Sequence, residues 1–320
     1  MDNSFFKVLR SGINSTYQDK GRFGLQHFGI AAGGCMDGES FSLANAILGN
    51  KETEGMIEFA YQGPLLKLMK GKIKFVITGN VIFKITYSNN KTVEGKVYKS
   101  YNLEEGDEID ILATNDSVYG YLSVKGGFDI KPFCNSVSTL VKGAIGPNGG
   151  KKIGNGDNIL TKNYDDDDKR NLFIDYTSSS SNIIRILKGP QYEYFSNDSK
   201  KNFFSQSYNV TNLTDRMGMR LEGPALKNIV SSNIRSEGIT KGAIQVPADG
   251  QPIILLTDHP TIGGYPKIAS VASVDYDLLV QKKPRTNISF ECIELKEAEQ
   301  LYNEKQNKIS KIIKNIEEVN

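Results

Sequence analysis

Chemically reactive side chains crowd one short stretch of the sequence, residues 257–267, which reads TDHPTIGGYPK. It holds one of the two histidines in the chain, next to an aspartate and followed by a lysine. A neutral imidazole can accept or donate a proton near pH 7, and a lysine can hold a carboxylate or polarise a carbonyl. Asp258, His259 and Lys267 are therefore candidates for proton transfer and for binding a negative charge.

A second loop, residues 17–37, carries the other histidine, His27, together with Arg22 and several glycines. Glycine lets the backbone take positive φ and lets N–H groups approach a bound oxyanion closely, and Gly263 and Gly264 offer the same freedom in the first stretch. A purely structural interpretation stays open for each residue, because Asp258 can equally hydrogen-bond the turn backbone and His259 can form a rigid corner with the following proline.

Strands are the main elements that must position these loops. Runs rich in β-branched and aromatic residues predict strands at 73–77, 81–87, 108–112, 118–124, 182–187, 252–256 and 287–293. The run 252–256 leads directly into the reactive stretch. Many short strands joined by glycine-rich turns favour a mainly β fold of barrel or sandwich type.

Helical patterns are few. Residues 38–48 form an apolar stripe that Asp37 can cap and Gly49 can end, a shorter helix starts near Asp275, and a tail with helical spacing begins at 295. The acidic run at 165–168 is typical of a solvated linker. We therefore expect an N-terminal β-rich domain at 1–179, a second β domain at 180–293 and a helical tail at 294–320.

Composition excludes several classes of function. The 320 residues carry 39 basic and 37 acidic side chains, so no strong field favours nucleic acid or an anionic membrane. No apolar run approaches the ~20 residues that span a bilayer, and no signal peptide is recognisable, which predicts a cytoplasmic protein. Three widely spaced cysteines and two distant histidines predict neither disulfides nor a metal site. Phosphate-loop, dinucleotide and nucleophile-elbow motifs are absent from the sequence.

Longer motifs identify a family resemblance. They are GRFGLQHFGIAAGGCMDGESFSLANAILGN (21–50), EFAYQGP (58–64), LSVKGGFD (122–129), LKGPQ (187–191), TDRMGMRLEGP (214–224) and SEGITKGAIQVPADGQPIILLTDHPTIGGYPKIASV (236–271). With these motifs the chain resembles the KipA family, also called allophanate hydrolase subunit 2-like or biotin-dependent carboxyltransferase-like proteins. The resemblance extends from about residue 6 to residue 290.

The resemblance implies two β-barrel-like domains, the C-terminal one cyclophilin-like. It also implies a subunit that works with a KipI-like (PxpB-type) chain and a PxpA-type chain to open 5-oxoproline to glutamate, with ATP and Mg used at the level of the complex. Two alternatives stay open: a carboxyltransferase acting on a urea-like amide with carboxybiotin carried by another protein, or a KipI-binding antagonist without turnover. Lys70, after Met69, is not flanked as a biotin-attachment lysine would be, so covalent biotin on this chain is not expected.

Site residues follow from the chemistry and the motif positions together with the resemblance. Asp258, His259 and Lys267 are expected to be catalytic, and Arg22 and His27 to lie at the rim of the pocket or at a partner interface. The chain departs from the family where members carry Gly-Ser-Arg-Ser-Thr, because Val137 replaces the arginine and so removes a bidentate donor. The residues expected to bind the amide or lactam substrate are Arg216, Arg220, Gln245, Gly263, Gly264 and Tyr265.

Overall fold

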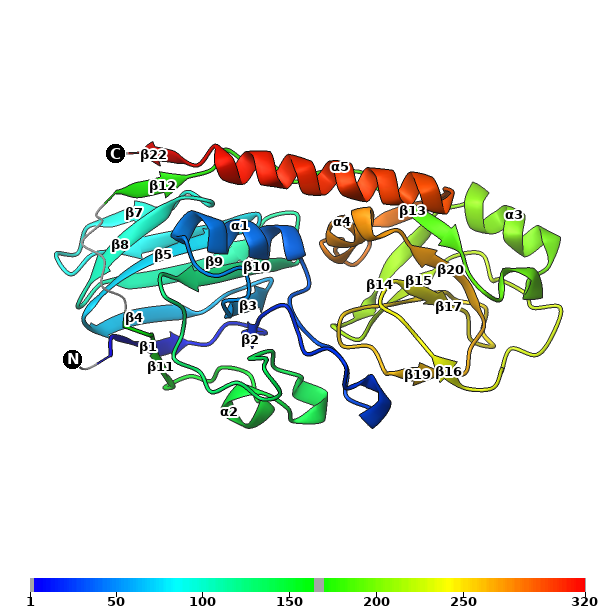
Figure 1. Ribbon diagram of the computed structural model, residues 1–320, viewed down its shortest axis with the longest axis horizontal. Helices are drawn as coiled ribbons and strands as arrows, with labels where there is room; N and C mark the ends of the chain where they lie inside the picture. The colour runs from blue at the N-terminus through cyan, green and yellow to red at the C-terminus, as the bar shows by residue number, and fades with distance from the viewer. Residues whose placement is uncertain (1–2, 164–169, 320) are drawn as a thin grey trace. The chain divides into compact units, whose positions relative to one another are not determined.

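The computed structural model describes residues 3–163 and 170–319 and divides the chain into two compact units (Figure 1). Unit 1 consists of Met1–Arg22, Gly33–Thr177 and Lys308–Asn320, and unit 2 consists of Phe23–Ala32 and Ser178–Asn307. The division after Thr177 falls close to the expected boundary at residue 179. The acidic run at 165–168 lies outside the described residues.

Unit 1 is built on two antiparallel sheets, in the strand orders β11-β1-β4-β9-β6-β7 and β2-β3-β10-β5-β8. Among the described residues these sheets do not close into the barrel-like domain that was expected here. Their bounds are β1 (Phe5–Arg10), β2 (Thr16–Gln18), β3 (Met56–Ala60), β4 (Leu65–Lys70), β5 (Lys72–Thr78), β6 (Val81–Thr86), β7 (Thr92–Glu94), β8 (Ser100–Glu104), β9 (Glu108–Thr114), β10 (Tyr119–Val124) and β11 (Asn158–Leu160).

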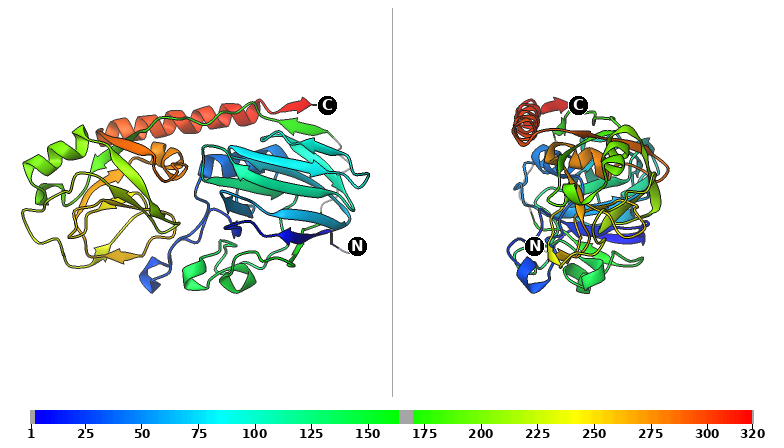
Figure 2. Two further views of the ribbon diagram at one scale, coloured as in Figure 1. Left: turned by 180° about the vertical axis from the view of Figure 1, so that it is seen from behind. Right: turned by 90° about the vertical axis from the view of Figure 1, so that its right-hand side faces the viewer.

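Helix α1 (Gly38–Leu48) packs on β5 and β10 in unit 1. The left view of Figure 2 shows α1, in blue, behind the strands of this unit. Asp37 caps it by accepting a hydrogen bond from the Ser40 backbone N–H at 3.0 Å, and Gly49 ends it in the left-handed conformation at φ 62°. The predicted helix and both of its end signals are therefore confirmed. The short helical turns of unit 1 are η2 (Val141–Gly143) and α2 (Pro147–Gly150).

Unit 2 contains a closed barrel of strands in the order β13-β20-β17-β18-β15-β14-β21, which confirms a mainly β fold with a barrel. A two-stranded ribbon, β16-β19, lies outside the barrel order. The bounds are β13 (Ile183–Lys188), β14 (Tyr208–Thr214), β15 (Gly218–Glu222), β16 (Glu237–Gly238), β17 (Ala243–Gln245), β18 (Ile253–Leu255), β19 (Ile262–Gly263), β20 (Lys267–Val271) and β21 (Asn287–Cys292).

The helices of unit 2 are short. They are η1 (Gln26–Phe28), η3 (Tyr192–Tyr194), α3 (Asn197–Ser205), η4 (Ser273–Asp275) and α4 (Tyr276–Val280). The helix expected near Asp275 is present as η4 and α4. The sequence did not predict α3, because only Ser199 and Phe203 of this polar helix are buried and no apolar stripe marks it.

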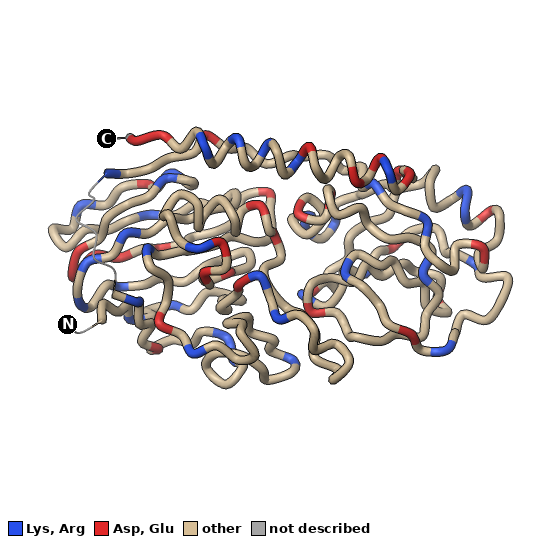
Figure 3. Tube along the Cα trace, viewed as in Figure 1, with Lys and Arg blue, Asp and Glu red and all other residues tan. Residues whose placement is uncertain are grey.

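Helix α5 (Leu295–Lys314) is the predicted tail helix, but it does not form a domain of its own. Its first half buries Ala298 against Ala272 and Ile293 of unit 2, and Ile309 joins the core of unit 1. The acidic residues of α5 lie in its first half and most of its lysines in its second half (Figure 3). The tail then ends in a strand rather than a helix, β22 (Glu317–Val319), which pairs with β12 (Asn171–Phe173).

Each predicted strand corresponds to an observed one, namely β5, β6, β9, β10, β13, β18 and β21. Within the described residues, no helix is both long and apolar enough to cross a membrane. Cys35, Cys134 and Cys292 are free thiols.

Candidate functional site

Four side chains from four neighbouring barrel strands form one row on the outer face of the barrel in unit 2. Arg220 of β15 lies opposite Ile253 of β18, Ile253 lies opposite Gln245 of β17, and Gln245 lies opposite Lys267 of β20. Residues directly opposite in antiparallel strands point to the same face of a sheet. The row faces outward because the neighbouring side chains are fully buried in the barrel, namely Met219, Leu221, Ile244, Ile254 and Ile268.

The β16-β19 ribbon covers one end of this row. Glu237 lies opposite Gly263 in the ribbon, and a Cβ placed on Gly263 would stand 2.6 Å from Gln245 Nε2. A larger residue at this position would therefore push the Gln245 amide aside. Under this cover Gln245 and Lys267 are only 6% and 5% exposed, although both point out of the barrel.

The Lys267 ammonium forms an ion pair with a partly exposed carboxylate. Its Nζ lies 2.5 Å from Glu237 Oε1, and the Glu237 side chain is 43% exposed. The same oxygen accepts a hydrogen bond from Gln191 Nε2 at 2.9 Å, while Gln191 Oε1 accepts one from the Lys267 backbone N–H at 3.1 Å. The Lys267 ammonium and then the Gln191 amide lower the pKa of Glu237, so this carboxylate is ionised at neutral pH.

Gln245 presents a buried donor with no acceptor. Its Nε2 has no hydrogen-bond partner among the described residues, and Lys267 Nζ makes no contact with a described polar group beyond the Glu237 ion pair. An unsatisfied buried donor costs about 1–3 kcal/mol, so such groups are uncommon outside functional sites. Gln245 and Lys267 thus place two donors side by side under the ribbon, where an oxyanion or a carbonyl oxygen of a ligand could accept from both.

Arg216 and Asp258 form a bidentate ion pair beyond the ends of β14 and β18. Arg216 Nε and Nη2 donate to the two carboxylate oxygens of Asp258, both at 2.8 Å, and the Asp258 backbone N–H donates to the Arg216 carbonyl at 2.8 Å. The side chains are only 8% and 7% exposed. Because both oxygens of Asp258 are engaged, the carboxylate is better suited to orientation than to proton transfer, the two roles considered for it, and it fixes the loop in place.

His259 is buried next to this ion pair with one ring nitrogen engaged. Its Nδ1 lies 2.6 Å from the Pro260 carbonyl oxygen, which can only accept, so Nδ1 carries the hydrogen and Nε2 is the basic nitrogen of the neutral ring. Burial lowers the pKa of His259; the hydrogen bond to Pro260 opposes this, Lys241 adds to it, and Asp258 opposes it. His259 is therefore a neutral base at pH 7.

The strand register separates the expected catalytic and substrate-binding residues into two groups. Gln245 and Lys267 stand level with Ile253 at the start of β18, whereas Asp258 and His259 follow the end of that strand. The intervening chain then passes back along the ribbon before β20 begins. Lys267, Gln245 and Gly263 are thus brought together, and Asp258, His259 and Arg216 form a second cluster.

The remaining predicted residues take varied positions. Arg220 shares the outward row but is paired with Asp249 at 3.2 Å. Gly264 accepts a hydrogen bond from the Ile234 backbone, and Tyr265 is 39% exposed beside the ribbon. His27 lies exposed in η1 of unit 2, in contact with the Phe28 ring.

Arg22 and Val137 both lie in unit 1. Arg22 is 2% exposed and donates to the Ser138 carbonyl, so it belongs to the interior of the unit and not to an exposed rim. The backbone N–H of Val137 donates to Asp19 at 2.7 Å, and its side chain packs against Gly55. Position 137, where the family resemblance implies an arginine, is therefore an apolar contact in this chain.

Two site residues were missing from the sequence prediction, Gln191 and Glu237. Both stand inside motifs that carry the family resemblance, LKGPQ and the stretch that begins SEG. The motif positions could have nominated them, but only the structure brings Gln191 and Glu237 to Lys267.

The chain is similar to known proteins in both sequence and fold. Residues 28–292 match the family described as carboxyltransferase domain, subdomain A and B. The chain is 33% identical to a Haemophilus influenzae protein named as a 5-oxoprolinase subunit, over 98% of this chain and 99% of that protein, and 29% identical to the same-named protein of Escherichia coli over 91% and 92%. Its fold is similar to urea amidolyase of K. lactis, with a TM-score of 0.88 and 26% identity over 98% of this chain and 20% of that one.

The buried ion pair between Arg216 and Asp258 predicts a large loss of stability when one partner is replaced and a recovery when both are replaced. Asp258→Asn removes the charge from a buried guanidinium partner and should cost about 3 kcal/mol of unfolding free energy, whereas Arg216→Met combined with Asp258→Leu should recover most of it. Asp249→Asn, which breaks the more exposed pair with Arg220, is the control and should cost less than about 1 kcal/mol. Denaturant unfolding measures the stability of all three variants. Equal losses of unfolding free energy in Asp258→Asn and Asp249→Asn would refute a stabilising role of the buried ion pair between Arg216 and Asp258.

His259 predicts a pH dependence of stability. Its pKa in the folded state lies below the ordinary value of 6.5, so the unfolded chain binds the proton first as the pH falls. The contribution of His259 is fully present above pH 6.5 and is lost below it. Between pH 7.5 and pH 5.5 the wild type should therefore lose more unfolding free energy than His259→Asn. Parallel stability curves for the two proteins would contradict the assignment.

Proposed function

Because the chain belongs to the carboxyltransferase domain family, subdomains A and B, we propose that it is the PxpC-type subunit of an ATP-dependent 5-oxoprolinase. The assembly would open 5-oxoproline to glutamate, with this chain binding the substrate. Support comes from near full-length similarity to two proteins that are both named as the same 5-oxoprolinase subunit.

The observation that carries the proposal is the pair of buried donors under the ribbon. 5-Oxoproline presents a carboxylate and a lactam N–C=O unit. Lys267 Nζ can bind the carboxylate in a charge-assisted contact, and the free Gln245 Nε2 can donate to the lactam carbonyl. A substrate carboxylate would take the place of the Glu237 carboxylate, which already occupies the position of an anion beside Lys267 and Gln191.

The second cluster would support this site. The clamp between Arg216 and Asp258 holds the turn that leads from β18 toward the ribbon, so Asp258 is a positioning residue. His259 offers Nε2 as a neutral base for a proton on the lactam nitrogen or on an attacking water.

ATP and Mg would be used by the assembled complex, and this chain would not bind them through a standard nucleotide-binding loop. The N-terminus of α1 follows a glycine-rich loop, but the Asp37 carboxylate already accepts from the Ser40 backbone N–H there, so a phosphate would meet a negative charge. KipI-like (PxpB-type) and PxpA-type subunits are the proposed partners that would complete the enzyme in the cytoplasm.

A second candidate function is carboxyl transfer to a urea-like amide. The similarity to urea amidolyase over 98% of this chain favours it, although this chain corresponds to a fifth of that protein. The same two donors would then bind a urea-like carbonyl, and turnover would require bicarbonate and a biotin carrier. A 5-oxoprolinase requires neither.

Reconstitution tests the proposal. This chain, a KipI-like chain and a PxpA-type chain should together release glutamate from 5-oxoproline in the presence of ATP, and omission of any one should abolish release. Turnover that persists without this chain would refute the proposed function. A stable complex with the KipI-like chain but no turnover would favour an antagonist, and a strict bicarbonate requirement would favour carboxyl transfer.

Lys267→Met should reduce turnover of the reconstituted enzyme by about a hundredfold or more, because a substrate-binding charge is lost from a water-poor site. Methionine has nearly the same length and leaves Glu237 able to reach water, so the fold should persist. Lys201→Met, at an exposed position of α3, is the matched control and should retain full activity. Near-normal turnover of Lys267→Met would remove this residue from the mechanism.

A further inference from the structure

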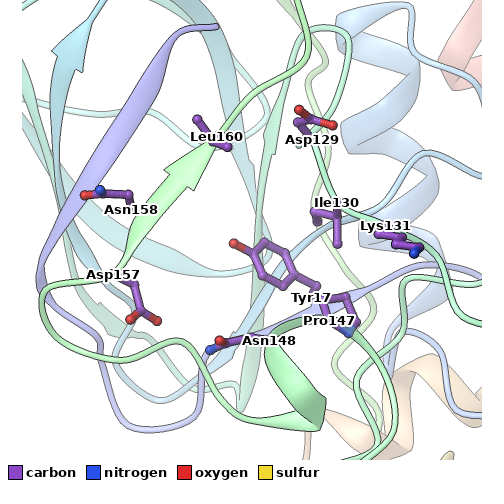
Figure 4. Close-up of a pocket in the computed structure, with 9 residues that line it drawn as sticks. All are labelled: Tyr17, Asp129, Ile130, Lys131, Pro147, Asn148, Asp157, Asn158 and Leu160. Carbon is purple, nitrogen blue, oxygen red and sulfur yellow. The ribbon is translucent and has the colours of Figure 1, made fainter.

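Unit 1 contains a cavity of about 340 Å³ that is separate from the site in unit 2 (Figure 4). Its walls come from β2, from the segment that follows β10, from α2 and from β11. Its volume is at the lower end of the range of pockets that hold small organic molecules.

Tyr17 of β2 brings an unused polar group to this cavity. The residue is only 9% exposed. No hydrogen bond to a described residue engages its hydroxyl, which is not among the fully buried polar atoms and so borders the cavity. Figure 4 shows the Tyr17 ring amid the lining side chains, with its hydroxyl on the side of Asp157 and Asn158. Burial and then the charge of Asp157 raise the pKa of Tyr17, so the phenol stays protonated. The hydroxyl of a largely buried tyrosine normally finds a hydrogen-bond partner, and a ligand in the cavity would supply one here.

Asp157 contributes a carboxylate oxygen that is similarly available. Its Oδ2 accepts from the Gly154 backbone N–H at 2.7 Å, which fixes the side chain in a tight turn. Its Oδ1 forms no hydrogen bond with a described residue. Asp129 stands across the cavity with Oδ2 accepting from Asn3 at 3.0 Å. The two carboxylates are thus oriented by local contacts rather than neutralised by a salt bridge with a described cation.

The remaining lining combines apolar surface with further acceptors. Ile130, Pro147 and Leu160 provide the apolar part, and the side-chain amides of Asn148 and Asn158 provide carbonyl oxygens. Lys131 is the one cation of the described lining and is exposed. The lining is therefore net negative, two carboxylates against one ammonium, in a chain whose formal charge is +2.

We propose that this cavity is a binding site for a small organic cation, with an ammonium group donating to Asp157 Oδ1 and to the Tyr17 hydroxyl oxygen and a short hydrocarbon chain lying against Ile130, Pro147 and Leu160. Asp129 receives a second cationic group where the ligand carries one. An isolated anion is disfavoured by the two carboxylates. The site is independent of the proposed 5-oxoprolinase activity, because its residues all belong to unit 1.

A titration of the full chain with putrescine tests this site, with 1,4-butanediol as the matched neutral probe of the same carbon skeleton. Isothermal titration calorimetry at neutral pH and low salt should show saturable binding of putrescine and no binding of the diol. Tyr17→Phe removes only the hydroxyl, and Asp157→Asn removes only the charge while retaining an acceptor for Gly154. Each should weaken putrescine binding about tenfold or more.

Glu105→Gln, at an exposed position of unit 1, is the control for a general loss of negative charge and should leave putrescine binding unchanged. Thermal unfolding of each variant checks that the unit remains folded. Failure of putrescine to bind, equal binding of the diol, or wild-type affinity in both Tyr17→Phe and Asp157→Asn would overturn the proposal.

Discussion

The register between β17 and β20 is the constraint on which the candidate site depends. It sets Gln245 opposite Lys267 on the outer face of the barrel, where both side chains would meet water if nothing covered them. The two-stranded ribbon covers them instead, and it can approach because Gly263 has no Cβ to collide with the Gln245 amide. Both donors are therefore shielded from water. Lys267 has Glu237 as its partner, whereas the acceptor for Gln245 Nε2 is left to a ligand.

Glu237 gives this arrangement a specific chemical character. A buried ammonium without a counter-charge would be costly, and a carboxylate from the ribbon supplies one at 2.5 Å. Because Glu237 is partly exposed and its strand is only two residues long, it can leave for solvent more easily than a core residue could. An incoming carboxylate would find Lys267 charged and Gln191 already oriented by the Lys267 backbone.

Local sequence signals predicted much of the fold. β-Branched runs located the strands, and the Asp37 and Gly49 signals located α1, because caps and strand propensity act over a few residues. The tail was predicted as a helix but not as an element divided between two cores, since its apolar stripe does not reveal what will cover it. The passage of residues 23–32 into unit 2 was likewise invisible to local signals.

The site was predicted less completely for the same physical reason. Lys267 and Gln245 were nominated from chemistry and motif position, but their pairing with Gln191 and Glu237 is a long-range contact. The sequence left Asp258 open to proton transfer or to orientation, because it does not show that Arg216, a residue 42 positions away in the chain, holds both of its oxygens. Residue type indicated what each side chain can do, whereas only the tertiary structure determined which groups remain free to do it.

A crystal structure of the reconstituted assembly with 5-oxoproline bound would show whether Gln245 and Lys267 bind the substrate. We expect ligand oxygens within hydrogen-bond distance of Gln245 Nε2 and Lys267 Nζ, with Glu237 displaced from the ammonium. An ordered 5-oxoproline molecule bound elsewhere, with the ion pair between Glu237 and Lys267 intact, would contradict it.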